Sequence, residues 1–164
     1  MRFSRRSIKL LSLISIIVCG LLFLADNASA HETLSKGETV YVSIYSNVYL
    51  GPKSRSFEVA AMLSIRNTDP KYAITIHLAD YFNTKGEKIA GYIKETIHLK
   101  PLESTSFNIS DYDKKGGAGA NFIVKWSSKE KVNTPIIEGI MLGTRSGQGI
   151  SFVCPGRSIT EHQE

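Results

Sequence analysis

The chain has 164 residues, with 20 lysines and arginines against 15 aspartates and glutamates and a formal net charge of +5. Four of the basic residues and one of the acidic residues fall in residues 1–30, so residues 31–164 carry a charge of only +2. Since no basic cluster remains after residue 30, the composition argues against nucleic acid as a partner.

Residues 1–30 have the pattern of a secretory signal peptide. A basic start is followed by the apolar run LLSLISIIVCGLLFLA at residues 10–25 and by ASA at residues 28–30, a small-x-small cleavage site. We expect a helical signal peptide, cleavage after Ala30 and a single mature domain over residues 31–164. The run is shorter than the roughly 20 residues that span a bilayer, which favours cleavage. A retained membrane anchor is the alternative. The mature protein is thus predicted to be exported, periplasmic or extracellular, and held at the membrane only through an uncleaved signal.

The mature part alternates apolar and polar residues. TVYVSIY at residues 39–45 and FEVAAMLSIRN at residues 57–67 place apolar side chains at every second position, which is typical of half-buried strands. The alternation returns in AITIHLADYF, TIHL, TSFNI, NFIVKW, PIIEGIML and GISFVC. Short strands separated by turns predict an all-β fold: a single antiparallel β-sandwich, immunoglobulin-like in general shape, with its core at about residues 37–157. An open barrel is the alternative.

Turn segments separate these strands. NTDP at residues 67–70 ends a strand, because Pro70 lacks an amide hydrogen and the side chains of Asn67 and Asp69 can bond to the nearby backbone. NTKGE at residues 83–87 predicts a hairpin turn in which Gly86 adopts the left-handed conformation.

The glycine-rich stretch GGAGANF at residues 116–122 looks like a phosphate-binding loop. It lacks the Lys and Ser/Thr that a Walker loop needs, and it opens the alternation of a strand rather than a helix. We therefore interpret it as a turn or bulge that enters a core strand, and we expect no nucleotide there.

A second glycine-rich stretch, GTRSGQG at residues 143–149, carries Arg145 and Gln148 among its glycines. Glycines let a backbone approach a ligand closely, so these two side chains are candidates for contact with an anion or a glycan. The structural alternative is a hairpin connection without a ligand.

His31 would become the new N-terminus after cleavage. Its amine and imidazole together could chelate copper, and His77 and His98 are the candidates for a further ligand. Both lie on the polar side of their expected strands and outside any spaced ligand cluster. We therefore predict no cofactor, and copper at His31 is the only metal site that we consider.

Three further residues are unusual for their strands. Asp80 shares the parity of the apolar residues in AITIHLADYF, so it marks either a site or a place where the strand bends. Glu138 interrupts PIIEGIML in the same way. Cys154, the one cysteine after residue 30, lies on the apolar parity of its strand, and burial there would make its thiol unreactive.

The segments TVYVSIYS, LSIRNTDP, GGAGANFIVKW and PIIEGIMLGTRSGQGISFVCPGR together resemble an uncharacterised family of bacterial exported domains, known as a domain of unknown function. The resemblance runs from about Gly37 to Arg157. It implies an exported, single-domain protein and supplies no activity and no site residues.

No catalytic constellation is legible, so the predicted function is that of a non-catalytic binding or assembly module of the cell envelope. Its expected partner is an envelope protein or a glycan. The alternative is a hydrolase or a copper protein whose site is assembled from distant loops, with Asp80, Glu138 and a histidine meeting in one pocket.

Overall fold

The structure, a computed structural model, describes residues 34–110, 113, 115–145 and 147–159, which form twelve β-strands. The strands are β1 (Ser35–Ser43), β2 (Asn47–Leu50), β3 (Arg55–Glu58), β4 (Ala60–Arg66), β5 (Ile74–Phe82), β6 (Lys88–Gly91), β7 (Ile97–Leu99), β8 (Ser104–Ile109), β9 (Asn121–Val132), β10 (Ile136–Arg145), β11 (Gln148–Pro155) and β12 (Arg157–Ile159). These residues contain no helix, and so none that is long and apolar enough to cross a membrane. The expected signal peptide and its cleavage site lie outside the described residues.

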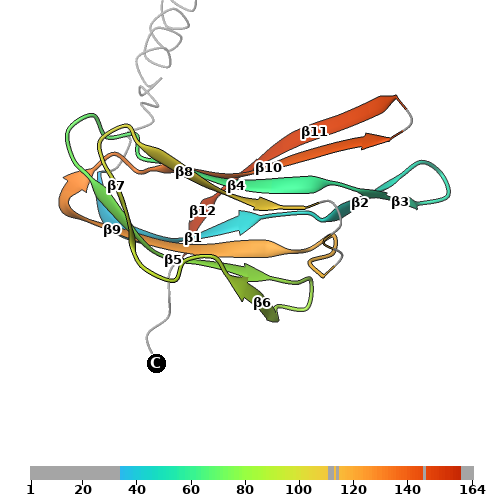
Figure 1. Ribbon diagram of the computed structural model, residues 1–164, viewed down its shortest axis with the longest axis horizontal. Helices are drawn as coiled ribbons and strands as arrows, with labels where there is room; N and C mark the ends of the chain where they lie inside the picture. Colours follow the sequence, from blue (N-terminus) through green and yellow to red (C-terminus); the bar gives the residue numbers. More distant parts are fainter. Residues whose placement is uncertain (1–33, 111–112, 114, 146, 160–164) are drawn as a thin grey trace, which may run out of the picture. The chain divides into compact units, whose positions relative to one another are not determined.

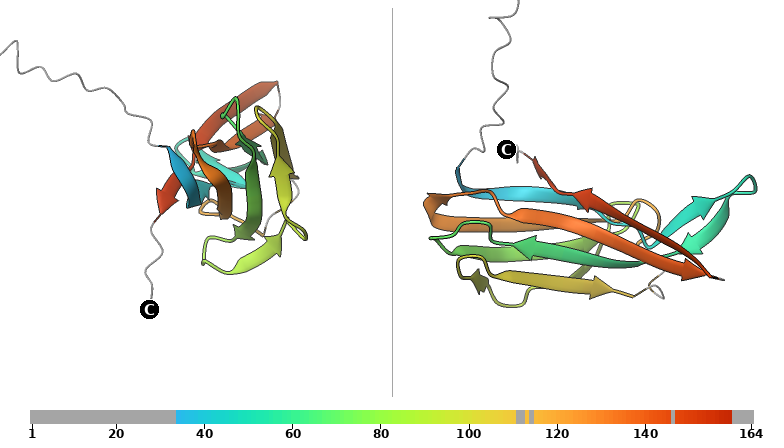
Figure 2. Two further views of the ribbon diagram at one scale, coloured as in Figure 1. Left: turned by 90° about the vertical axis from the view of Figure 1, so that its left-hand side faces the viewer. Right: turned by 90° about the horizontal axis from the view of Figure 1, so that it is seen from above.

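The strands form two antiparallel sheets that pack face to face, with a separate hairpin at one end (Figure 1). The six-stranded sheet has the order β12-β1-β9-β5-β6, and β7 also pairs with β5. The four-stranded sheet has the order β11-β10-β4-β8, which is visible from above in Figure 2. Strands β2 and β3 form the hairpin. The predicted all-β antiparallel sandwich is confirmed.

The core lies between the two sheets and is built by the predicted alternation. Strand β9 points Phe122, Val124 and Trp126 inward, and all three are buried. The four-stranded sheet meets them with Leu63 and Ile65 of β4, which are fully buried. Burial of such alternating apolar side chains stabilises each sheet only when the other covers it, so the two sheets depend on each other.

The alternating apolar residues of FEVAAMLSIRN are buried, but the segment is not one strand. These buried residues are Phe57, Val59, Ala61, Leu63 and Ile65. It divides at Val59 into β3, which pairs with β2, and β4, which belongs to the four-stranded sheet. At the division the Val59 N–H donates to the Ser46 carbonyl at 3.1 Å. The alternation continues across the break, which explains why the sequence pattern does not reveal it.

The predicted face of Asp80 is wrong, because a bulge in β5 changes the parity of that strand. Ile76 lies opposite Trp126 and Leu78 lies opposite Lys125, so His77 is an extra residue in β5. After the bulge Tyr81 is in the core, and Asp80 points to the outer face of the six-stranded sheet. The irregularity in this strand is therefore at His77, three residues before Asp80.

The turn predictions for NTKGE and GGAGANF are confirmed. In NTKGE the Asn83 N–H donates to the Glu87 carbonyl at 2.9 Å, and Gly86 has a φ of +79°. In GGAGANF, Gly117 has a φ of +80° and the segment leads into β9.

Candidate functional site

The clearest candidate site is a pocket between two hairpins that project at the same end of the sandwich, β2–β3 and β10–β11 (Figure 1). We call it the hairpin pocket. It has a volume of about 520 Å³. Its lining residues are Leu50, Gly51, Arg55, Ser56, Phe57, Arg145 and Gln148. Both residues that the glycine-rich stretch GTRSGQG suggested as ligand contacts are therefore in one pocket.

Close packing at Gly143 brings the two hairpins together. A Cβ atom at Gly143 would lie 2.6 Å from a ring carbon of Phe57, so only glycine lets that ring pack against β10. The Phe57 side chain is 8% exposed, which anchors β3 at this end. Arg145 then donates from Nη1 to the Ser56 carbonyl at 3.4 Å, a direct link between the hairpins.

The hairpin pocket is cationic. The guanidinium groups of Arg55 and Arg145 and the amide of Gln148 supply hydrogen-bond donors, and none of the described residues that line it is acidic. Glu58 follows Phe57 but lines a different hollow, beside Asn47. Planar guanidinium groups bind carboxylates and phosphates in a bidentate manner, so the chemistry of the pocket suits an anionic group.

Arg55 is not recognisable as a site residue from the sequence. It stands in GPKSRS, where lysine, serine and glycine look like an ordinary solvated turn. The signal that identifies it is Phe57, two residues later, whose burial fixes β3 against β10. That signal requires knowledge of which strands meet.

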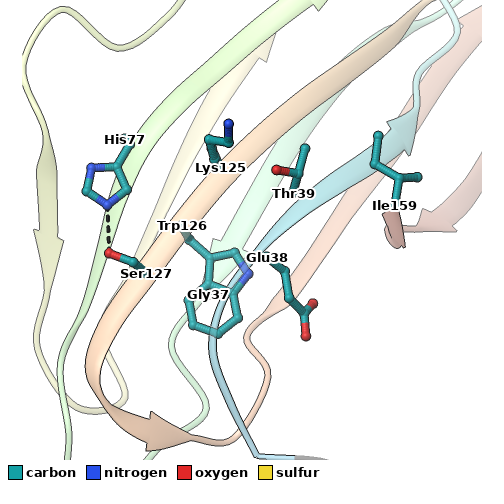
Figure 3. A pocket seen from close by; sticks show the side chains of 8 residues that line it. All are labelled: Gly37, Glu38, Thr39, His77, Lys125, Trp126, Ser127 and Ile159. Carbon is teal, nitrogen blue, oxygen red and sulfur yellow. Dashed lines mark hydrogen bonds between the residues drawn. The ribbon is translucent and has the colours of Figure 1, made fainter. Parts of the chain in front are cut away.

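A second hollow lies on the outer face of the six-stranded sheet and places a serine beside a histidine. It has a volume of about 430 Å³ and is lined by residues of β1, β5, β9 and β12 (Figure 3). In it the hydroxyl of Ser127 and Nε2 of His77 lie 2.7 Å apart, a hydrogen bond between β9 and the bulge of β5. A hydroxyl that bonds an imidazole is the first half of a nucleophilic site.

This hollow does not place a carboxylate beside the histidine to orient it. Glu38, its acidic residue, belongs to β1, and β9 lies between β1 and the His77 side chain (Figure 3). A similar pair, Thr75 Oγ1 and His98 Nδ1 at 2.9 Å, lies nearby on β5 and β7. Two such pairs on an open face are cross-strand hydrogen bonds that stabilise a sheet surface.

The structure brings no predicted metal site together. His77 and His98 each bond a hydroxyl, and within residues 34–159, apart from the gaps given above, no group of three His, Cys, Asp or Glu side chains could hold a metal ion. His31 lies outside the described residues, so copper at the N-terminus stays a prediction.

Asp80 and Glu138 lie far apart in the fold. Asp80 is on the outer face of the six-stranded sheet, where its Oδ2 forms an ion pair with Lys88 Nζ at 2.5 Å. Glu138 lies opposite Ser64 on the outer face of the four-stranded sheet. The sandwich core separates the two carboxylates, so they share no pocket with each other, and the carboxylate site considered for a hydrolase is not formed.

Cys154 shares the inner parity of β11 with Phe152, as the alternation predicts. It is half-buried, and burial raises the pKa of its thiol. A raised pKa keeps the sulfur protonated and makes it a poor nucleophile.

Comparisons with known proteins bear on the family and not on the site. Residues 37–159 match a family described as "Protein of unknown function (DUF3124)". No match to the chain is found among curated proteins. A solved structure described as "Crystal Structure of Thermotoga maritima 1070" is similar, with a TM-score of 0.44 and 10% sequence identity, over 75% of this chain and 93% of that chain.

Proposed function

Because this chain belongs to the family of proteins of unknown function DUF3124, which brings no activity with it, we propose a function from the geometry alone. The protein is an exported, non-catalytic binding or assembly module of the cell envelope. Its ligand carries a carboxylate or a phosphate, which binds in the hairpin pocket. The observation that supports this most directly is that Arg55, Arg145 and Gln148 line one pocket without an acidic residue among them.

A binding role fits the rest of the described chain better than catalysis does. The acidic residue of the hollow that holds the Ser127–His77 pair is Glu38, which lies on β1, across β9 from His77, and Asp80 and Glu138 lie on opposite outer faces. The hairpin pocket offers donors but no nucleophile paired with a base. Such a pocket recognises a charge and leaves it unchanged.

The proposed site predicts that both arginines bind anions. Replacing Arg55 and Arg145 together by alanine is expected to weaken binding of inorganic phosphate and of acetate at least tenfold, because a charge-assisted hydrogen bond contributes about 1.5 to 3 kcal/mol. The measurement is a titration followed by the Nε–H resonances of the arginine side chains in the exported protein. In the wild type, the resonances of these two arginines should shift and saturate.

Arg66 provides the matched control for this titration. It is an exposed arginine of β4, and its Nε donates to the Ser64 hydroxyl at 3.2 Å, away from the hairpin pocket. Replacing Arg66 by alanine should leave anion binding unchanged. Equal weakening by Arg66→Ala, or shifts spread evenly over all arginines, would show a general effect of charge and would contradict the proposed site.

Export predicts a defined processing site. The ASA sequence before His31 is the expected cleavage point, so the mature protein should begin at His31. Intact-mass measurement of protein recovered from the envelope fraction tests this. A mass that includes Met1 would replace the proposal of a released module by that of a membrane-anchored one.

A further inference from the structure

The edges of the two sheets differ in how well they resist pairing with another strand. In the six-stranded sheet, edge strand β12 has three residues and contains Arg157, while β6 has four residues, contains Lys88 and pairs with a register shift. Short, charged or bulged edges are the usual protection against further pairing. Both edges of this sheet are therefore protected.

Strand β11 has none of these features. It has eight residues, Gln148–Pro155, with no charged side chain among them, and it pairs with β10 in unbroken register. Within the described part of the chain β10 is its only partner, so its other side leaves backbone groups unpaired (Figure 1). The chain crosses to the other sheet at Gly156, where the Gly156 N–H donates to the Ile137 carbonyl at 2.7 Å. The unpaired edge of β11 therefore extends from Pro155 back to Gln148.

The side chains along this edge suit an added strand. On the inner side Ile150, Phe152 and Cys154 are only partly buried although they pack against the core. On the outer side Val153 is 52% exposed. A strand beside β11 would cover apolar surface on both sides, which favours its binding together with the backbone hydrogen bonds.

The direction of such a strand determines which of its ends reaches the hairpin pocket. Both sheets are antiparallel, and a strand that runs antiparallel to β11 ends beside Gln148. Gln148 lies opposite Arg145, and both line the hairpin pocket with Arg55. The C-terminus of the added strand, with its negative charge, thus arrives at the two guanidinium groups.

From these contacts we infer that the β11 edge and the hairpin pocket form one peptide-binding site. Its occupant is the extended C-terminal tail of a partner protein, on the order of five residues long. The tail pairs antiparallel with β11 and places its free α-carboxylate at Arg55 and Arg145, and its side chains beside Ile150 and Phe152 are apolar. This inference rests on the proposed function and names the ligand of the same pocket. The other uncharged edge of this sheet, β8, does not line the hairpin pocket and serves as an internal comparison.

Two immobilised libraries of random hexapeptides test this site. One library ends in a free carboxylate, and the other ends in a carboxamide but is otherwise identical. The exported protein, carrying a fluorescent label, is expected to be retained at least tenfold more by peptides with the free carboxylate. The double variant Arg55→Ala/Arg145→Ala should lose this preference and Arg66→Ala should keep it. Equal retention by both libraries, or retention by neither, overturns the inference.

Strand pairing has its own readout. In a selected peptide, N-methylation of alternate amides should lower affinity at least tenfold in one parity and leave it unchanged in the other, because only one set of amides faces β11. Equal effects in both parities contradict pairing at the edge. A dimer of this chain that Val153→Lys dissociates, without retention of any peptide, would show that a second copy occupies the edge instead. If the wild-type protein binds phosphate but retains neither library, this inference alone is overturned. If the wild-type protein does not bind phosphate at all, the proposed function is overturned.

Discussion

Replacing Asp69 by alanine is expected to lower the free energy of unfolding by about 3 kcal/mol. Asp69 is 6% exposed, and its carboxylate accepts hydrogen bonds from the N–H groups of Lys71 and Tyr72 at 2.8 Å and of Asn133 at 3.1 Å. Alanine leaves these three donors without their acceptor, and each unsatisfied donor costs about 1 to 3 kcal/mol where water does not replace it. Urea unfolding followed by circular dichroism measures the change.

Asp113 provides the comparison for this variant. Its carboxylate accepts a hydrogen bond from the Lys115 N–H at 2.9 Å in an exposed turn, so water can replace the acceptor. Asp113→Ala should therefore cost less than about 1 kcal/mol. If both variants lose the same stability, the buried bonds of Asp69 are not the cause of its effect.

The contribution of Asp69 should also depend on pH. The Lys71 N–H is the main cause that lowers the pKa of Asp69 below its ordinary value of 3.8; burial opposes it, and the N–H groups of Tyr72 and Asn133 lower it further. Because the pKa is lower in the folded state, the stabilisation is complete above the unfolded pKa. It is lost as the pH falls below about 4 and through the folded value. The variant Asp69→Asn should lose this part of the acid dependence.

The turn at NTDP shows how far local sequence predicts structure. The expected local bonds are present: the Asp69 N–H donates to Asn67 Oδ1 at 3.0 Å, and the Lys71 N–H donates to Asp69 Oδ1. The sequence does not show that Asn67 Nδ2 also donates to the Lys100 carbonyl at 2.9 Å, or that Asp69 reaches Asn133. Those partners are 33 and 64 positions away, so only the packed fold brings them together.

Strand β5 shows where the alternation fails. Up to Ile76 the inward side predicted from the sequence is correct, and the His77 bulge then reverses it. The apolar residues Leu78 and Phe82 continue the old parity on the outer face, so composition alone gives no sign of the reversal. Ala79 and Tyr81 are both buried on the core side after the bulge. The sequence does not mark them as core residues, because alanine is small and tyrosine ends in a hydroxyl.

The residues of the candidate site could likewise be predicted only in part from the sequence. Arg145 and Gln148 could be predicted because glycines surround them in one loop. Arg55 and the free edge of β11 could not, because both depend on which strands are neighbours. A sequence shows which residues are available for binding an anion, and the topology decides which of them meet.

Replacing Gly116 by alanine is expected to lower the free energy of unfolding by about 3 kcal/mol. A Cβ atom there would overlap the hydroxyl of Tyr81, whose side chain is fully buried. Gly117→Ala should cost about 1 to 2 kcal/mol, because Gly117 has a φ of +80°. Gly119→Ala should cost less than about 1 kcal/mol, since its Cβ would lie 3.0 Å from a terminal methyl of Thr84. Urea unfolding of the three variants gives the order, and equal losses would contradict a structural role for each position.

The same loop should not respond to nucleotides. A phosphate-binding loop needs free backbone N–H groups, but the Gly117 N–H donates to Ser46 Oγ at 2.7 Å and the Gly119 N–H donates to Thr84 Oγ1 at 3.0 Å. ATP, GTP and nicotinamide dinucleotides should therefore leave the melting temperature unchanged, whereas a ligand at a hundred times its dissociation constant would stabilise the protein by about 2.7 kcal/mol. Thermal melts test this directly. A rise with ATP that disappears in the stable variant Gly119→Ala would show that these N–H groups leave their hydroxyl partners to bind phosphate.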